Sequence, residues 1–268
     1  MYLLLIVFVC LFALYVLALK GRTSNKNTQK FLNKRYAHRG LHKKTTVPEN
    51  SMAAFKSAVD KGYGIELDVH LMSDGNLAVI HDSSLKRTAG VDICIEELTA
   101  ADLNKFPLEG SNETIPLFQD VLKLVDGKVP LLIEIKTAAN IDKVTRKVVE
   151  NLKDYNGEYC IESFDPRCIL WLKKNAPNIV RGQLTQDFIK EKADLSVFTR
   201  FLLTPLILNF VNRPDFIALK YSDRKEIQFK IVKSIWKLPL FAWTVTDRET
   251  AVVLDKEGYT LIFEQFEF

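Results

Sequence analysis

Cysteine is scarce in this chain, and no pair of cysteines has the spacing of a metal or redox motif. The 268 residues include four cysteines, Cys10, Cys94, Cys160 and Cys168, which lie far apart and form no CxxC motif. A chain of this length buries a hydrophobic core without cross-links, so neither a disulfide scaffold nor a thiolate zinc site is indicated. Hydrophobic residues make up 47% and charged residues 26%, a packed globular composition that excludes intrinsic disorder.

Acidic residues are absent from the first part of the chain. Residues 1–48 contain nine Lys and Arg and no Asp or Glu, whereas residues 49–268 contain 28 basic and 33 acidic residues, a net charge of −5. A nucleic-acid-binding surface requires basic residues spread over the folded part of a protein. The mildly acidic remainder therefore argues against a nucleic-acid partner.

A long hydrophobic run occurs only once, at the N-terminus. Tyr2–Leu19 is free of charge and would form a helix about 27 Å long, against about 30 Å for the hydrocarbon core of a bilayer. A retained anchor is favoured over a cleaved signal peptide, because no basic residue precedes the run and no small-x-small cleavage site follows it. Basic residues follow the run, which places the remainder in the cytoplasm by the positive-inside rule. We expect a single-pass membrane protein with a transmembrane anchor (1–19), a flexible basic tether (20–34) and a globular domain (35–268).

The rest of the chain alternates short apolar runs with helical patterns, which is typical of a parallel sheet with helical crossovers. The predicted strands are Tyr36–His38, Ile65–His70, Leu131–Ile135, Tyr159–Ser163, Val180–Leu184, Phe216–Leu219, Leu240–Val245 and Thr260–Phe263. The predicted helices include Ser51–Lys61, Leu117–Leu124, Asp142–Leu152, Arg167–Asn175 and Arg248–Lys256. Eight strand–helix units predict an α/β fold of the (β/α)₈ TIM-barrel type, which typically needs about 250 residues.

One segment is too short for a parallel crossover. Asp74-Gly75 is a strong two-residue hairpin signal, so Leu77–His81 is expected to return antiparallel as an extra strand. If these two residues form the turn, His81 lies directly opposite Asp68 on one face of the hairpin.

A second apolar stretch, Phe201–Val211, is interrupted by Thr204, Pro205 and Asn209. It is too short to span a bilayer. The favoured interpretation is a barrel helix or loop packed on the core, and the alternative is an element at the membrane surface or on the path of the substrate.

Carboxylates recur with strand periodicity. Glu66 and Asp68 share one face of their predicted strand, and Glu134 shares a face with Lys136 on the next crossover strand. Acids buried together repel one another unless a cation neutralises them, and oxygen ligands suit Mg²⁺ or Ca²⁺ rather than zinc. We therefore predict one divalent cation held by these three acids.

Two histidines and two cations are predicted at the same mouth. His38 and Arg39 end the first strand at the carboxyl-terminal face, where barrel enzymes keep their chemistry, and His81 reaches it from the hairpin. Histidine suits proton transfer near neutral pH, and Arg39 with Lys136 offers two cations to an anionic substrate.

Three further residues are weaker candidates. We expect His42 to be solvated in a Lys-rich loop and His70 to lie nearer the hairpin turn than Asp68. Glu49, within Pro48-Glu-Asn-Ser51, belongs either to a simple helix N-cap or to the support of the site.

Several strings in this order resemble the glycerophosphodiester phosphodiesterase family. They are Ala37-His-Arg-Gly-Leu-His42, Pro48-Glu-Asn-Ser51, Gly64-Ile-Glu-Leu-Asp-Val69, Ser73-Asp-Gly75, His81-Asp82 and Glu134-Ile-Lys136. The resemblance is specific from Tyr36 to Lys136 and looser through Ser163-Phe164, Gly182-Gln-Leu184 and Trp243-Thr-Val245. Many relatives carry Thr-Asp where this chain has Phe263-Glu264.

The resemblance implies a metal-dependent enzyme that converts glycerophosphodiesters into glycerol 3-phosphate and an alcohol. Its general acid and base would be the histidines matching His38 and His81, and its cation ligands would be the three acids named above. Arg39 and Lys136 would hold the phosphate with Glu49 bracing them, and Phe164 and Trp243 become candidates for substrate binding.

The identity of the base, the attacking oxygen, the ion, the alcohol and the oligomeric state stay open at this stage. Soluble glycerophosphodiesters are the favoured substrates. One alternative is a lysophospholipase D that acts on membrane lysolipids, and another, of a different class, is a non-catalytic anchored receptor for phosphodiesters. A receptor would have no need for two histidines over a metal, which favours the enzyme.

Overall fold

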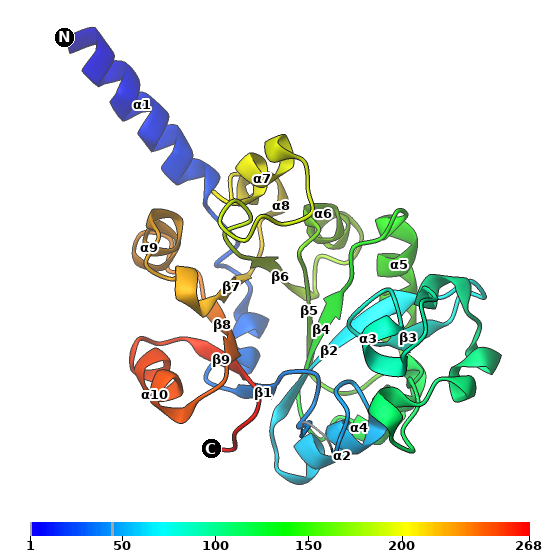
Figure 1. Ribbon diagram of the computed structural model, residues 1–268. Coiled ribbons are helices and arrows are strands. Elements are labelled where there is room, and N and C mark those ends of the chain that lie inside the picture. The colour runs from blue at the N-terminus through cyan, green and yellow to red at the C-terminus, as the bar shows by residue number, and fades with distance from the viewer. Residues whose placement is uncertain (1, 44–45) are drawn as a thin grey trace.

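The structure is a computed structural model that describes residues 2–43 and 46–268. Eight parallel strands form a closed barrel in the order β1-β9-β8-β7-β6-β5-β4-β2, with β2 returning to β1 (Figure 1). The barrel strands are β1 (Arg35–Ala37), β2 (Gly64–Leu71), β4 (Leu131–Ile135), β5 (Tyr159–Ser163), β6 (Val180–Thr185), β7 (Phe216–Lys220), β8 (Leu240–Val245) and β9 (Thr260–Phe263). The predicted TIM-type barrel is thus confirmed, with strand boundaries within two residues of those expected.

Helices cover the outside of the barrel, and several of them begin at a residue whose side chain caps the helix. The longer ones are α2 (Met52–Asp60), α4 (Phe118–Val125), α5 (Ile141–Asn151), α6 (Pro166–Asn175), α9 (Ile227–Ser234) and α10 (Arg248–Lys256). The shorter ones are α3 (Lys86–Ala89), η2 (Ile95–Glu97), η3 (Ala100–Lys105), η4 (Leu108–Gly110), α7 (Val197–Leu203), α8 (Asn209–Asn212) and η5 (Tyr221–Asp223). Side chains of Ser51, Asn140, Asp165 and Asp247 each accept a backbone N–H at a helix start, which satisfies donors that lack an intrahelical partner.

Strand alternation divides the barrel interior into an apolar layer and a polar layer. Leu132 and Cys160 belong to a buried cluster to which nearly every strand contributes, and which therefore lies inside the barrel. Two residues further along the same strands come Glu134 and Glu162, which are paired in register. Because alternate residues share a face, β4 and β5 both change from apolar to acidic as they approach the carboxyl-terminal mouth.

The hairpin strand β3 (Leu77–Val79) pairs antiparallel with β2, as predicted, but its register differs by one residue. The loop has three residues, Ser73–Gly75, instead of the expected two, and Gly75 adopts φ 82°. Ile80 donates its N–H to the carbonyl of Asp68 at 3.1 Å. The predicted pairing of His81 with Asp68 is therefore wrong, because His81 lies beyond the end of the ladder.

The N-terminal helix α1 (Tyr2–Ala18) has 17 residues and projects away from the barrel (Figure 1). Met1, the first residue of the predicted anchor, lies outside the described residues. Within residues 2–43 and 46–268, no helix is both long and apolar enough to cross a membrane. The expected transmembrane anchor at 1–19 is accordingly not supported: the helix stops at Ala18, and Leu19 is fully buried against the barrel.

Residues 20–34 pack against the barrel, which differs from the flexible tether expected. Arg22 donates to the carboxylate of Asp215 at 2.5 and 2.6 Å, and Lys26–Phe31 form a 3-10 helix, η1. Phe31 is buried, and its carbonyl accepts a hydrogen bond from the hydroxyl of Tyr36. The composition of this segment does not predict these contacts, because partners such as Asp215 lie far away in sequence.

The apolar stretch Phe201–Val211 forms the end of α7 and most of α8. Leu206 and Asn209 are buried, in agreement with packing on the core, whereas Phe201 is exposed. The stretch thus has one face on the barrel and another in solvent.

Candidate active site

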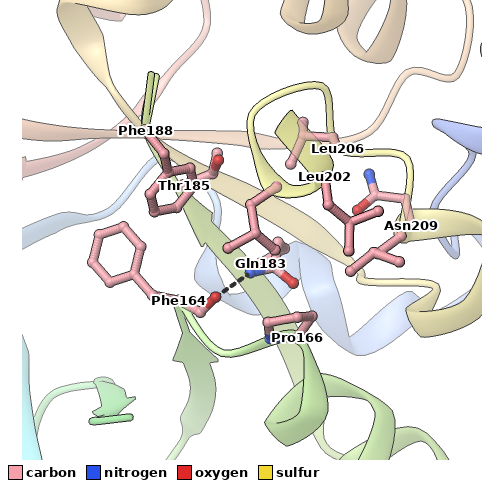
Figure 2. A pocket seen from close by; sticks show the side chains of 10 residues that line it. Phe164, Pro166, Gln183, Thr185, Phe188, Leu202, Leu206 and Asn209 are labelled. Atoms are coloured by element: carbon pink, nitrogen blue, oxygen red, sulfur yellow. Dashed lines mark hydrogen bonds between the residues drawn. The ribbon is translucent and has the colours of Figure 1, made fainter. Parts of the chain in front are cut away.

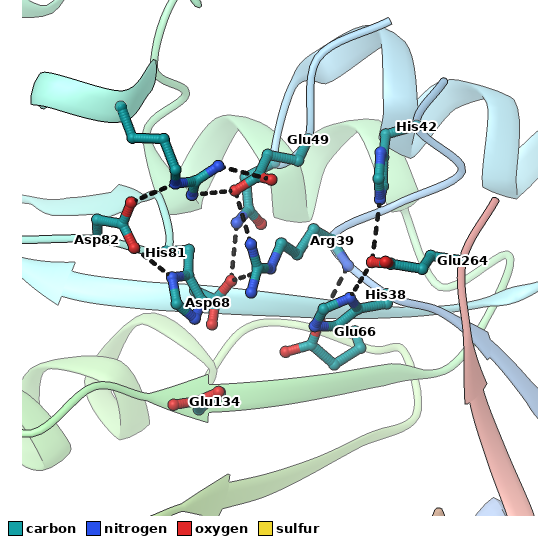
Figure 3. A network of polar contacts seen from close by, with 12 residues as sticks. His38, Arg39, His42, Glu49, Glu66, Asp68, His81, Asp82, Glu134 and Glu264 are labelled. Atoms are coloured by element: carbon teal, nitrogen blue, oxygen red, sulfur yellow. Dashed lines mark hydrogen bonds and ion pairs between the residues drawn. The ribbon is translucent and has the colours of Figure 1, made fainter. Parts of the chain in front are cut away.

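Three buried carboxylates converge at the mouth of the barrel, as the strand pattern predicts (Figure 3). Glu66 and Asp68 come from β2 and Glu134 from β4, where it pairs in register with Asp68. Only 2%, 1% and 6% of these residues, respectively, is exposed. One oxygen of each carboxylate lies within 4.8 Å of the other two. This spacing allows all three to bind a single ion.

The charge balance of this group favours a bound cation. Burial and the neighbouring Asp68 raise the pKa of Glu66 well above its usual value, and burial likewise raises the pKa of Glu134. Burial acts in the same direction on Asp68, but Lys136 and other nearby cations outweigh it and hold that pKa well below its usual value. The negative charge is therefore only partly compensated by side chains. An all-oxygen donor set of this kind fits a hard divalent cation.

Arg39 is anchored to the same acids. Its N–H donates to Glu66 at 2.9 Å, its guanidinium Nη1 donates to Glu49 at 2.8 Å, and Nε lies 3.6 Å from Asp68. The backbone turns sharply here, with φ 55° at Arg39 and φ 80° at Gly40. A Cβ at Gly40 would lie 2.9 Å from Ala54, so only glycine fits this turn.

Lys136 is the second cation of the site. Its Nζ lies 2.8 Å from Glu134 and 3.3 Å from Asp68. Although burial opposes the charged form, the two carboxylates raise the pKa of Lys136 above its usual value. The ammonium group is therefore permanently charged beside the acids.

His38 reaches the mouth from the end of β1 and is held by a carboxylate. Its Nδ1 lies 2.7 Å from Glu264, and Nε2 of His42 lies 3.5 Å from the same oxygen (Figure 3). Burial lowers the pKa of His38, while the hydrogen bond to Glu264 opposes that shift. When Nδ1–H donates to Glu264, Nε2 of His38 is the basic nitrogen. The expectation that His42 is solvated is wrong, because only 12% of its side chain is exposed.

His81 has the same arrangement on the opposite side of the mouth. Its Nδ1 lies 2.6 Å from Asp82, and burial lowers the pKa of His81 to about 4. Asp82 is held in turn by Arg87 Nε at 2.5 Å, and the same guanidinium donates to Glu49 at 2.6 and 3.1 Å. Glu49 therefore links Arg39 to Arg87 and, through Asp82, to His81. This role is separate from any contribution of Glu49 to the start of α2.

Four supporting residues were missed by the sequence interpretation: Arg87, Asn50, Glu162 and Glu264. Asn50 donates to Asp68 at 2.8 Å. Glu162 is 1% exposed, and its Oε2 has no hydrogen-bond partner in the described part of the chain. Burial and Glu134 raise the pKa of Glu162 well above its usual value. The alternation of β5 contains the signal for Glu162, which follows Cys160 as Glu134 follows Leu132.

His70 lies outside the mouth and supports the chain near His81. Its Nδ1 lies 2.7 Å from Glu96, and its Nε2 lies 3.2 Å from the carbonyl of His81. His70 shares strand β2 with Glu66 and Asp68, but it contacts the loop that contains His81 and does not belong to the acidic cluster.

Aromatic side chains form the apolar wall of the cavity. Phe164 and Trp243 both line it and contact each other edge to face, with ring centroids 5.7 Å apart. The indole Nε1 of Trp243 is buried and has no hydrogen-bond partner among residues 2–43 and 46–268. Phe164 also borders a neighbouring cavity beneath α7, where Gln183 donates to its carbonyl at 3.2 Å (Figure 2).

Comparisons with known proteins agree on one family. A family model described as the glycerophosphoryl diester phosphodiesterase family matches residues 38–264. A glycerophosphodiester phosphodiesterase from Caldanaerobacter subterraneus is 33% identical over 83% of this chain and 89% of its own length. Human lysophospholipase D GDPD1 is 34% identical over 50% of this chain and 45% of its own length. A phosphodiesterase from Oleispira antarctica, solved in complex with the product sn-glycerol-3-phosphate, has a TM-score of 0.72 at 23% identity and covers 88% of this chain and 94% of its own.

Proposed function

Because this chain belongs to the glycerophosphodiester phosphodiesterase family and is an enzyme of that class, we propose that its barrel mouth hydrolyses soluble glycerophosphodiesters to glycerol 3-phosphate and an alcohol in a cation-dependent reaction. One observation supports this most strongly. Three buried carboxylates, two cations and two carboxylate-paired histidines converge on one mouth. This is the set that acid–base cleavage of a phosphodiester requires.

Arg39 and Lys136 bind the phosphate in this proposal. Both already contact the acidic cluster, and their charges attract the phosphodiester and offset the charge that grows during the reaction. Glu66, Asp68 and Glu134 would hold one Mg²⁺ or Ca²⁺, which, when bound, stabilises negative charge on phosphate oxygens. Glu49 fixes the guanidinium of Arg39 through its 2.8 Å hydrogen bond.

His38 and His81 divide the proton transfers. With Nδ1 of each ring bonded to a carboxylate, Nε2 is the nitrogen that meets the substrate. One imidazole, neutral, removes the proton from the attacking oxygen, and the other, protonated, gives a proton to the departing alkoxide. Glu264 and Asp82 fix the tautomer and stabilise positive charge on the ring that each contacts.

Phe164 and Trp243 form the apolar side of the cavity and contact the carbon atoms of the substrate. No described residue accepts a hydrogen bond from the buried indole N–H of Trp243, so this group is available to donate to an oxygen of the bound diester. Glu162, whose raised pKa favours the protonated form, supplies a further polar group at the floor.

A second candidate function is the release of the headgroup alcohol from lysophospholipids. It is favoured by one observation: Phe164, at the rim of the site, also borders a mostly apolar cavity lined by Leu202, Leu203 and Leu206. In this second candidate, the acyl chain of the lysolipid would lie against that apolar side of the mouth. The non-catalytic receptor is not supported, because the chain belongs to an enzyme family.

The test uses the purified full chain after treatment with EDTA. Glycerol 3-phosphate released from glycerophosphocholine, and choline released from lysophosphatidylcholine, are measured before and after Mg²⁺ or Ca²⁺ is added. We expect ion-dependent turnover of glycerophosphocholine in the wild type and loss of about 10²-fold or more in Glu134→Gln. The matched control, Glu267→Gln, changes an acid whose partners, Lys43 and Lys61, are both exposed. Full turnover in EDTA, or by Glu134→Gln, would contradict the cation-dependent mechanism, and a preference for the lysolipid would favour the second candidate.

A further inference from the structure

Helix α7 presents apolar side chains to solvent. Val197, Phe198 and Phe201 are 65%, 77% and 61% exposed. Their spacing of one, three and four residues puts them on one outward face of the helix. Leu202 and Leu203 face the cavity that Phe164 borders (Figure 2). We call the outward face, together with the exposed apolar residues that flank α7 along the chain, the α7 apolar surface; its members are Ile189, Leu195, Val197, Phe198, Phe201 and Phe210.

Helix α1 identifies the kind of partner that covers this side of the molecule. Four consecutive residues, Leu3–Ile6, are each at least 59% exposed, and consecutive residues point to every side of a helix. The helix contains no charged residue. A protein groove or a second helix would cover only one of its sides, whereas lipid surrounds all of them. Lipid is therefore the partner that would cover the outer turns of α1 on every side, whatever the depth to which the helix enters the lipid.

Two hydrogen bonds join α1 and the residue that follows it to the segment after α7. The hydroxyl of Tyr15 in α1 donates to the carbonyl of Pro205, just after α7, at 3.2 Å. Asn209 of α8 donates to the carbonyl of Leu19 at 3.3 Å. In Figure 1, α1 projects from the side of the barrel where α7 and α8 lie. A lipid surface that receives α1 therefore lies next to the α7 apolar surface.

Charge at the foot of α1 is suited to lipid headgroups. Lys20 is exposed and lies 5.1 Å from the ring centroid of Trp236, whose Nε1 donates to the carbonyl of Val16. An indole and an ammonium at the end of an apolar helix match the interface between hydrocarbon and anionic headgroups. Lys20 and Trp236, at the C-terminal end of α1, would therefore lie at the boundary between the lipid surface and the barrel.

We propose that the α7 apolar surface is a second lipid contact beside α1, which docks the rim of the active site on a lipid surface. The inward face of α7 lines the cavity that shares Phe164 with the active site, so the docked helix lies between lipid and the catalytic mouth. The contact is compatible with either substrate class considered above, because it depends on α1 and the outer face of α7 and not on the residues of the catalytic mouth.

The test measures the depth of single nitroxide labels in the full chain on vesicles of phosphatidylcholine and phosphatidylserine. Cys10 and Cys94 are replaced by Ser, which leaves only the buried Cys160 and Cys168. Phe198→Cys and Phe201→Cys are labelled in separate samples. The matched controls are Val252→Cys and Val253→Cys on α10, which are 47% and 46% exposed.

On vesicles, we expect the α7 labels to become several-fold more accessible to oxygen than to a water-soluble nickel chelate, while the α10 labels stay accessible to the chelate. Both α7 labels remaining accessible to the chelate would overturn the proposal. Spin–spin broadening between α7 labels, without lipid exposure, would assign the surface to a second copy of the chain and also overturn it. The readout is independent of turnover, so a failure of the proposed phosphodiesterase chemistry does not affect it.

Discussion

The hydrogen bond between Glu264 and His38 offers a quantitative test of the proposed proton transfer. Glu264 Oε2 lies 2.7 Å from Nδ1 of His38. Although burial acts in the opposite direction, the contacts with His38 and His42 hold the pKa of Glu264 well below its usual value. Glu264→Gln keeps the size of the side chain and removes its charge. The imidazole then loses the anion that fixes its tautomer and stabilises its protonated form.

A hydrogen bond to a charged group contributes about 1.5–3 kcal/mol, and about 1.4 kcal/mol corresponds to a tenfold change in rate. We therefore expect Glu264→Gln to lower kcat by about 10- to 150-fold, with a smaller change in KM, since Glu264 contacts the histidine and not the phosphate-binding cations. Initial rates with glycerophosphocholine measure both constants. Glu267→Gln, three residues along the chain, is the control, because its ion pairs are with Lys43 and Lys61. A loss of less than about threefold in Glu264→Gln, or an equal loss in the control, would refute the role given to this bond.

Three further predictions concern charge in the site. Glu66→Gln removes a carboxylate whose raised pKa makes the fold less stable as pH rises. In EDTA we therefore expect the variant to have a higher Tm than the wild type by calorimetry, and its Tm should rise less than that of the wild type when Mg²⁺ or Ca²⁺ is added. A lower Tm of the variant in EDTA would contradict this. Arg87→Lys cannot bridge both Asp82 and Glu49, so we expect kcat to fall about tenfold and Asp82→Asn to add little further loss in the double variant; full additivity of the two losses would argue against a shared network. Burial lowers the pKa of His81 from 6.5 to about 4, so between these pH values the unfolded state binds more protons and stability falls as pH falls. His81→Asn should therefore lose less Tm than wild type on acidification, and an equal loss would exclude His81 as a source of acid sensitivity.

Local periodicity was sufficient to predict the barrel and its acidic cluster. Strands β2 and β4 pair without a break in register, so the parity of Glu66, Asp68 and Glu134 follows from their spacing alone. The hairpin register was missed because a three-residue loop, closed by Gly75 at φ 82°, suits the same residues as a two-residue turn. The position of His81 near the acids was nevertheless right, because the chain turns toward the mouth after β3 ends.

Partners that lie far apart in sequence were beyond the reach of these patterns. Glu264 is 226 residues from His38, and Arg87 is 38 residues from Glu49. The periodicity of a strand or a helix relates only residues that are close in sequence, so it predicts neither pair. Phe31 likewise lies in a segment whose composition predicts flexibility, because its burial depends on the closed barrel that packs against it. Long-range ion pairs and core contacts of this kind become visible only once the fold is known.

The central claim is that His38 and His81, over the acids of β2 and β4, cleave a glycerophosphodiester. Phosphorus NMR of glycerophosphocholine, incubated with the full chain and Mg²⁺ or Ca²⁺, tests it most directly. The wild type should convert the diester resonance into that of glycerol 3-phosphate, while His38→Ala and His81→Ala should each slow the conversion by about 10²- to 10⁴-fold and keep the wild-type circular dichroism. An unchanged diester resonance with the wild type and either ion, or comparable rates in both variants and the wild type, would contradict the account.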